Sequence, residues 1–364
     1  MRQLFTPLAF AFCTGLANLS HASDVNGLLN KALEDRSIPA MAVLVIKDGK
    51  VEQQAVQGVR ALDSSVKASL DDAWHIGSDT KAMTATMIAK LVERGVLSWT
   101  APLSSMLPKV AMHADYRDVT LADLLSHRAG LPPIIDEQKI ESYRKDPRSL
   151  RAVRAEYINI ALSEKPVAVA RQAANYSNSG YLVAAAIAER ATDKSYETLM
   201  QDEIYGPLGM VIHNADLQAH ELLGHKAGKP LSGPESDIPA FFAPAGSTTR
   251  LTLQDWAKFA IDQMAGEHGK GKLLRKESYQ LLHTPQGDTA SALGWGIKNA
   301  WPKTAPIRML THAGSNEYWY ALIALAPDFS GGVLVAANAG EDTGVAVAER
   351  NLLLSVMADL AEKK

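Results

Sequence analysis

Ser78 and Lys81 are three residues apart in the stretch WHIGSDTKAMTATMIAKLVERG, which spans residues 74–95. Apolar residues recur at helical spacing from this point on, so the two residues open a predicted helix. Side chains three residues apart lie on one face of a helix and can reach each other. A serine hydroxyl becomes a nucleophile when a neighbouring base accepts its proton. The spacing therefore predicts a nucleophile, Ser78, and its base, Lys81.

The same spacing occurs twice more, in Ser64 with Lys67 and in Ser142 with Lys145. Ser64 lies in a polar stretch without apolar periodicity, which indicates a solvated loop. Ser142 lies in a charged segment that is typical of a protein surface. Neither serine has apolar neighbours that could exclude water, so Ser78 is the candidate.

An alternative is that Ser78 only caps the helix, because serine is a favoured residue at helix N-termini. A cap is strengthened by an acid three residues later, whereas the third residue here is Lys81. A cation in the first turn faces the positive end of the helix dipole, and this field together with burial lowers the pKa of a lysine. The residue that is unfavourable for the helix is therefore suited to accept a proton.

A second motif, Tyr176 with Asn178 in NYSNSG, precedes a predicted apolar helix. Residues two apart in a turn can both point into one cleft. Tyr157 and Asn159 have the same spacing, but they lie within a predicted helix, where residues two apart diverge. We therefore take Tyr176 and Asn178 as the candidate pair.

A third motif, THAGS, ends a predicted strand with His312, Ala313, Gly314 and Ser315. A glycine at such a place lets a ligand approach the backbone closely. The backbone amide that follows it could form an oxyanion hole together with the amide of Ser78.

The ordered motifs Ser-x-x-Lys, Tyr-x-Asn and His-x-Gly resemble the serine β-lactamase and penicillin-binding protein family, in its class C-like branch. That branch also holds DD-carboxypeptidases, D-amino-acid peptidases and β-lactamase-like esterases. The flanking segments LADLLSHRAGLP, NYSNSGYLVAAAIAER, ETLMQDEIYGPLGM and PAGSTTRLTLQDWAKF look like the family as well. The resemblance covers essentially the whole chain after its N-terminal segment.

The resemblance implies catalytic roles for three residues. Ser78 would be acylated, Lys81 would be its proton partner, and Tyr176 would share the acid–base role. The substrate-binding residues that it implies are Asn178, His312, Ala313, Gly314 and Ser315. Asn178 would bind the substrate amide, and His312 would orient the tyrosine and the polar end of the substrate. The backbone amides of Ser78 and Ser315 would hold the oxyanion.

The third motif departs from the family pattern, since it reads His-Ala-Gly instead of Lys-Thr-Gly or His-Thr-Gly. Ala313 lacks a hydroxyl that in relatives helps to hold the carboxylate of a β-lactam or a terminal D-alanine. A lost hydrogen bond of this kind weakens binding by about 1–3 kcal/mol. His312 is also a less constant cation than lysine, because the unperturbed pKa of histidine is about 6.5. Both changes favour another ester or amide substrate.

The elements that position these residues change type along the chain. Runs rich in β-formers at 41–46 and 51–59, joined by Asp-Gly, predict a hairpin. Helical segments are expected at 80–94, 121–126, 151–162, 181–191, 196–204 and 253–264. Further strands are expected at 294–298, 308–312, 318–326 and 332–338, and a last helix at about 343–361. Residues 214–247 show no sustained period and predict a long surface excursion.

Strands on both sides of a run of helices predict an α+β fold rather than a parallel βαβ array. The resemblance implies the same class: an antiparallel sheet flanked by helices, plus an inserted all-helical domain. We predict a discontinuous sheet domain at 23–72 and 245–364 and a mostly helical domain at 73–244, with the site between them.

The first 22 residues predict a cleavable signal peptide. Arg2 is followed by a largely apolar run, and small residues precede a cut after Ala22. The alternative, a buried N-terminal helix, fits less well because the run abuts a polar segment with its own helical period. We therefore expect a periplasmic or secreted protein without a stable membrane anchor after cleavage. Its single cysteine, Cys13, would be removed, which leaves no disulfides or thiol chemistry.

Composition excludes several classes of partner. The chain has 364 residues and a net charge of −3, and no run of basic residues indicates nucleic acid or an anionic membrane as a partner. His220 and His225 superficially resemble a zinc helix, but they are five residues apart instead of four, so we expect no metal and no cofactor. The expected partner is a small-molecule or peptide acyl substrate, and the sequence leaves the oligomeric state open.

The sequence therefore predicts an exported serine hydrolase that forms an acyl-serine intermediate on an ester or amide substrate. The alternatives are a true class C-like β-lactamase or DD-carboxypeptidase, and a non-catalytic penicillin-binding-like protein that only binds its ligand.

Overall fold

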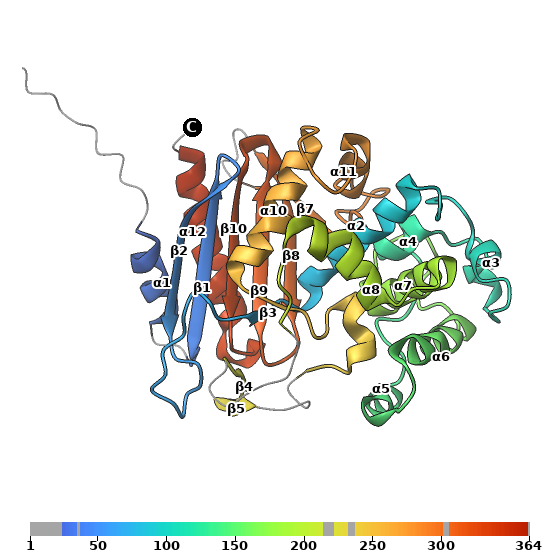
Figure 1. Ribbon diagram of the computed structural model, residues 1–364, viewed down its shortest axis with the longest axis horizontal. Helices are drawn as coiled ribbons and strands as arrows, with labels where there is room; N and C mark the ends of the chain where they lie inside the picture. The colour runs from blue at the N-terminus through green and yellow to red at the C-terminus, as the bar shows by residue number, and fades with distance from the viewer. Residues whose placement is uncertain (1–23, 35–36, 214–221, 232–236, 301–305, 363–364) are drawn as a thin grey trace, which may run out of the picture.

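A six-stranded antiparallel sheet forms one side of the protein (Figure 1). The structure is a computed structural model that describes residues 24–34, 37–213, 222–231, 237–300 and 306–362. Its strand order is β2-β1-β10-β9-β8-β7, and each neighbouring pair is antiparallel. The strands are β1 (Ala40–Lys47), β2 (Lys50–Gly58), β7 (Gly296–Ala300), β8 (Ile307–Ser315), β9 (Tyr320–Ala326) and β10 (Gly331–Ala337). The N-terminal hairpin thus completes a sheet whose other strands come from the end of the chain.

The hairpin between β1 and β2 turns at Asp48 and Gly49, as the sequence predicts. Their φ angles are +50° and +71°, and positive φ at both central residues is the pattern of a type I′ turn. Glycine adopts this conformation without steric cost, and aspartate tolerates it better than most residues.

Strand β1 is buried on both faces of the sheet, which explains its unbroken apolar sequence AMAVLVI. Alternate residues on one face pack with helices α1 (Val25–Leu33) and α12 (Val345–Glu362). The other alternate residues pack with α10 (Leu253–Glu267) in the main core. The sheet is therefore a layer between two groups of helices.

The remaining helices form the other side of the protein (Figure 1). They are α2 (Thr80–Glu93), α3 (Leu103–Met106), α4 (Leu121–Leu125), α5 (Glu137–Ser142), α6 (Leu150–Ser163), α7 (Asn178–Thr192), α8 (Tyr196–Met200), α9 (Gly206–Leu208) and α11 (Lys276–Leu282). Two short pairs, β3 (Trp74–His75) with β6 (Arg250–Leu251) and β4 (Gly224–Lys226) with β5 (Lys229–Leu231), complete the described elements. Helix α2 is buried along nearly its whole length, so its first turn lies deep in the protein.

The predicted α+β class, with an antiparallel sheet and a helical insertion, is confirmed. Each predicted helical segment contains an observed helix, although 196–204 is divided between α8 and a π-helical turn at Gln201–Tyr205. The predicted domain boundaries stay a prediction. The predicted signal peptide lies outside the described residues, and within these no helix is long and apolar enough to cross a membrane.

The predicted surface excursion at 214–247 is wrong for its last part. Ala240–Ala245 form a 3-10 helix, and Phe241 and Phe242 are buried in the main core. Residues 214–221 and 232–236 lie outside the described part of the chain. The turn that ends this segment reaches the site described below.

Candidate active site

Ser78 lies in a 3-10 turn, η1 (Gly77–Asp79), that leads into α2. Its Oγ accepts a hydrogen bond from the Lys81 Nζ at 2.9 Å and another from the Tyr176 hydroxyl at 2.7 Å. No side chain caps η1 or α2, so the capping alternative does not describe how Ser78 is used. The structure therefore brings the three predicted catalytic side chains together at one oxygen atom.

Lys81 is fully buried, and its Nζ also donates to the Ala245 carbonyl oxygen at 2.5 Å. Burial lowers the pKa of Lys81 well below its usual value, although the Asp79 carboxyl opposes this shift. The structure gives burial as the main cause of the lowered pKa that the sequence predicts. A lower pKa increases the share of neutral lysine, and the neutral amine can accept the Ser78 proton.

Tyr176 points its hydroxyl at Ser78, and 46% of the residue remains exposed to solvent. Desolvation raises the pKa of Tyr176 above its usual value, so the phenol stays protonated at neutral pH. The ring packs against His127 with 4.5 Å between ring centroids. His127 Nδ1 accepts a hydrogen bond from the Ser177 backbone nitrogen at 3.0 Å.

His127 therefore helps to position Tyr176. Burial, with the Lys81 charge as a second cause, lowers the pKa of His127 to about 3, so the imidazole is neutral and can accept at Nδ1. It fixes the Tyr176 side chain through both the ring contact and the backbone of the next residue. Sequence reasoning missed this role, and the signal was the family-like stretch LLSHRAG.

Asn178 begins α7, where Ser177 is the N-cap and accepts from the Gly180 backbone nitrogen at 3.2 Å. The Asn178 Oδ1 is buried and has no hydrogen-bond partner among the described residues. An unpaired buried acceptor is costly unless a ligand pairs with it. It is thus available to the N–H of a substrate amide.

The other three residue pairs with the spacing of a motif, which we did not take as candidates, each contain a residue with a structural hydrogen bond. The Tyr157 hydroxyl is buried and bonds the Ser179 hydroxyl at 2.8 Å. The Ser64 Oγ accepts from the Val66 backbone nitrogen, and the Ser142 Oγ donates to the Lys139 carbonyl oxygen. Neither serine hydroxyl bonds the lysine three residues later.

The third motif lies at the end of β8 and touches the turn that carries Ser78. A Cβ on Gly314 would lie 1.9 Å from the Ile76 carbonyl oxygen and 2.8 Å from the Ser78 nitrogen. A Cβ on Gly77 would lie 2.6 Å from the Ser315 nitrogen. The expectation that Gly314 makes room for a ligand is therefore wrong, because η1 occupies that space. The contact brings together the two segments whose amides are the predicted oxyanion hole.

His312 is neutral in this site. Its Nδ1 lies 2.9 Å from the Ala313 carbonyl oxygen, which can only accept, so Nδ1 carries the proton of that hydrogen bond. Burial and the nearby Lys81 lower the pKa of His312 to about 3. His312 thus does not replace the fixed positive charge of the lysine that many relatives have.

Asp79 is a site residue that sequence reasoning missed. Both carboxyl oxygens are buried without a hydrogen-bond partner among the described residues, and Oδ1 lies 3.9 Å from His312 Nδ1. Burial raises the pKa of Asp79 well above its usual value. Burial thus favours the uncharged forms of both Asp79 and Lys81. An acid between a nucleophile and its base was the available signal.

No group of three or more metal-ligating side chains occurs in the described part of the chain. His220, one of the two histidines that superficially resemble a zinc helix, lies outside the described residues.

A serine held by a buried lysine and a tyrosine, between an antiparallel sheet and a helical group, defines the β-lactamase-related serine hydrolases. The chain belongs to the Beta-lactamase family, whose sequence profile matches residues 25–357. The family resemblance predicted from the three motifs is thus confirmed.

Two curated relatives illustrate how similar the chain is to known sequences. It is 25% identical over 326 residues to Protein flp of Staphylococcus aureus (strain MRSA252), which covers 86% of this chain and 62% of that protein. The chain therefore spans less than two thirds of the Flp length. It is 28% identical over 280 residues to penicillin-binding protein 4 of Amycolatopsis lactamdurans, covering 72% of this chain and 71% of the relative.

Two solved structures share the fold. An octameric penicillin-binding protein homologue from Pyrococcus abyssi superposes with a TM-score of 0.76 at 22% identity, covering 92% of this chain and 77% of that one. SurE with D-Leu superposes with a TM-score of 0.72 at 20% identity, covering 91% and 74%. At these identities the likeness shows the fold alone.

Proposed function

We propose that this protein is an exported serine hydrolase that cleaves an ester or amide substrate through an acyl-Ser78 intermediate. One observation carries the proposal: the Ser78 Oγ receives hydrogen bonds from both Lys81 Nζ and the Tyr176 hydroxyl. A nucleophile with a neutral base on one side and a protonated acid on the other has what acyl transfer requires.

In the acylation step, the Ser78 Oγ attacks the substrate carbonyl carbon and its proton moves to the Lys81 amine. The negative charge that develops on the carbonyl oxygen lies toward the Ser78 and Ser315 amides. Tyr176 donates its proton to the leaving oxygen or nitrogen when the bond to the carbonyl carbon breaks. The Lys81 ammonium then returns a proton to the tyrosine, so that one proton has moved from serine to leaving group.

In the deacylation step, a water molecule attacks the carbonyl carbon of the acyl-Ser78 ester and gives its proton to the same Lys81–Tyr176 pair. The carbon–Oγ bond breaks, Ser78 recovers a proton, and the acid leaves. His312 is neutral and so adds no charge beside the base, and burial outweighs the Asp79 carboxyl, which acts to raise the pKa of Lys81.

A substrate other than a β-lactam or a terminal D-alanine is favoured by the third motif. The Ala313 methyl offers no hydrogen bond to a carboxylate, and the neutral His312 offers no fixed cation. Strong binding of that carboxylate would need a hydrogen-bond donor and a fixed cation at these two positions. We therefore propose esters as the first class of substrate. The second class is amides that carry a group other than this carboxylate beside the third motif.

The first prediction concerns Ser78→Ala beside the wild-type protein. Each is incubated with a short-chain p-nitrophenyl ester, a chromogenic cephalosporin and a D-Ala-D-Ala peptide. We expect ester turnover by the wild type, a loss of about 10⁴-fold or more in kcat for Ser78→Ala, and an acyl mass increment on Ser78 in quenched samples. Only the ester is expected to be turned over rapidly.

The other outcomes separate the alternatives. Rapid cephalosporin or D-Ala-D-Ala turnover that depends on Ser78 would replace the proposal by a β-lactamase or DD-carboxypeptidase. Binding of these compounds without turnover and without a mass increment would indicate a protein that only binds its ligand.

Export rests on the sequence of residues 1–22, and it predicts removal of that segment. When the full chain is expressed in a Gram-negative host, the mature protein should be released by osmotic shock and begin at Ser23. An intact N-terminus in the cytoplasmic fraction would contradict export and would leave the acyl-serine chemistry unaffected.

A further inference from the structure

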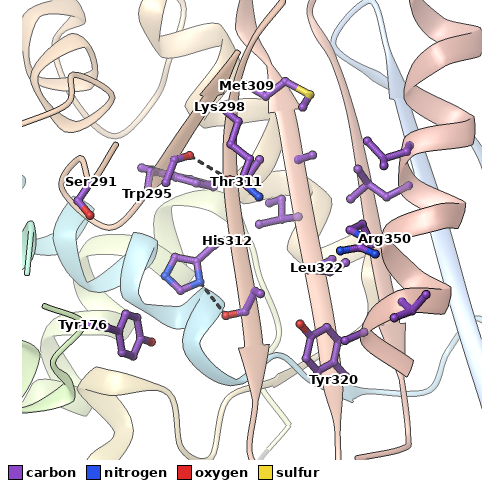
Figure 2. Close-up of a pocket in the computed structure, with 18 of the residues that line it drawn as sticks. Tyr176, Ser291, Trp295, Lys298, Met309, Thr311, His312, Tyr320, Leu322 and Arg350 are labelled. Carbon is purple, nitrogen blue, oxygen red and sulfur yellow. Dashed lines mark hydrogen bonds between the residues drawn. The ribbon is translucent and has the colours of Figure 1, made fainter. Parts of the chain in front are cut away.

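A groove of about 570 Å³ begins beside Tyr176 and His312 and runs across β8 and β9 to α12 (Figure 2). Tyr176 and His312 line its inner end, and α12 forms its far wall. The acyl-transfer chemistry proposed above does not use this space. A cavity of this size is large enough for a substantial part of a small-molecule ligand.

The groove exists because α12 covers only part of the sheet. The helix packs on β10 and β9, whereas β8 lies one strand further out. Alternate residues of β8, Met309, Thr311 and Ala313, line the groove and so share the face of the strand that α12 leaves open.

The walls of the groove are mainly apolar. On α12, Val347 is 43% exposed and Leu354 is 42% exposed, and both line the groove. Large exposed apolar side chains that gather in one place often mark a binding surface. Met309 and Leu322 extend the apolar surface along the sheet (Figure 2).

The charged side chains that line the groove are both positive. Lys298 on β7 and Arg350 on α12 line it, and neither forms an ion pair with another described residue. Among the described residues that line the groove, none is acidic. A ligand with a positive charge would therefore be repelled.

Ala313 connects the groove to the catalytic centre. The residue is exposed, and it is paired with Leu322 across β8 and β9, so the two side chains are neighbours on one face of the sheet. A threonine at this position would place a hydroxyl at the mouth of the groove. With alanine, the apolar surface of the groove continues along this face of β8 as far as Ala313.

The position of Tyr176, the proposed proton donor, indicates which half of the substrate lies in the groove. Tyr176 protonates the leaving atom in the proposed mechanism, and Tyr176 lines the groove. The opposite end of the motif, Ser315, instead lines a second pocket of about 410 Å³ that contains Asp237 and Glu317. The leaving group therefore faces the apolar groove, and the acyl group faces the polar pocket.

We propose that the groove between α12 and β8 binds the leaving group of the substrate, and that this group is an elongated apolar alcohol or amine without positive charge. This rests on the proposed function, since it assigns one half of the substrate of the same site. Arg350 and Lys298 at the walls exclude cationic leaving groups, and Val347, Leu354 and Met309 bury the apolar chain.

The test compares two series of esters with the wild-type protein. Acetate esters of straight-chain alcohols from ethyl to hexyl vary the leaving group, and ethyl esters of straight-chain acids from acetic to hexanoic vary the acyl group. The intrinsic reactivity of the alcohols changes little along the first series. We expect kcat/KM to rise with the leaving-group chain by up to about fourfold for each CH₂ that is buried, and to rise less with the acyl chain.

The groove variant is Val347→Gln with Leu354→Gln, and the matched control is Val211→Gln, an exposed valine that does not line the groove. Glutamine is a good helix former, so α12 should be retained. In the double variant, kcat/KM should no longer rise with the length of the leaving-group chain, so that hexyl acetate loses much more of its kcat/KM than ethyl acetate does. The control should keep the wild-type slope. An acetate ester of an amino alcohol should be cleaved more slowly than the neutral ester of equal length.

A leaving-group series without a slope, or a slope that the double variant retains, would overturn the proposal while ester turnover itself upholds the proposed function. If no ester is turned over, the proposed function fails, and binding still tests the groove. Calorimetry with the Ser78→Ala protein should then show hexyl acetate binding more tightly than ethyl acetate, with the difference lost in the groove variant. Equal binding of the two esters would overturn the groove as an apolar site.

Discussion

Lys81→Met is expected to lower kcat/KM for a short-chain ester by about 10²–10⁴-fold. Methionine has nearly the length of lysine and is apolar, so it suits a fully buried position. It cannot accept the Ser78 proton, and the hydroxyl is then left without its base. Steady-state kinetics with a p-nitrophenyl ester measure the loss, and circular dichroism checks that the fold is retained.

The same variant has an expected signature in stability. Burial lowers the pKa of Lys81 in the folded protein, so the unfolded chain binds this proton more tightly. The wild type should therefore lose stability relative to Lys81→Met as the pH falls from the usual lysine pKa toward the folded one, by up to about 1.4 kcal/mol per pH unit. A lost hydrogen bond to Ala245 shifts the two curves by a constant and leaves this slope unchanged.

Denaturant unfolding at several pH values measures that slope. Parallel stability curves for the two proteins would show that Lys81 keeps an ordinary pKa and would contradict its role as a neutral base. Lys90→Met on the same helix, where Lys90 donates to the Glu203 carbonyl oxygen and lies 3.4 Å from its carboxylate, is the matched control. It should leave the catalytic rate within a few-fold of the wild type.

Gly314→Ala is expected to lower kcat/KM by about 10²-fold, although only one methyl group is added. The new Cβ would collide with the Ile76 carbonyl oxygen at 1.9 Å and with the Ser78 nitrogen at 2.8 Å. Strand β8 and the turn η1 must then separate, and the Ser78 and Ser315 amides move apart. The loss should appear in kcat more than in KM, because the oxyanion forms only in the transition state.

Gly331→Ala is the control for this substitution. Gly331 begins β10 in the same sheet, and a Cβ there would meet its nearest atom, the Ile46 carbonyl oxygen, at an ordinary 3.6 Å. Unchanged activity in Gly314→Ala would mean that the close contact between β8 and η1 is not needed for the oxyanion hole.

Local signals in the sequence predicted most of the fold. Asp48-Gly49 specified the hairpin, and helical periodicity specified long helices such as α2 and α6. The strands that follow the helices along the chain, β7 to β10, required only their short β-rich runs between turn residues. These features depend on neighbours along the chain, so one sequence is enough to read them.

The missed parts of the site depend on contacts between distant segments. The Ala245 carbonyl oxygen holds Lys81 through a backbone atom, which no residue type reveals. The role of His127 depends on stacking against Tyr176. Asp79 is next to Ser78 in sequence, but its burial without hydrogen-bond partners depends on the segments that pack around it. Such features become visible only when the tertiary arrangement is known.

The position of β1 in the sheet also bears on how the fold can assemble. β1 lies between β2 and β10, and its pairing with β10 runs from Met41 with Ala337 to Ile46 with Gly332. Without β10, the hairpin of β1 and β2 has no strand that links it to β9 and to the strand that carries Ser315. The first strands of the chain can therefore join the rest of the sheet only after residues 331–337 have paired with β1. A chain that is cut before Gly331 should fail to assemble the sheet, although its hairpin and most of its helices are intact.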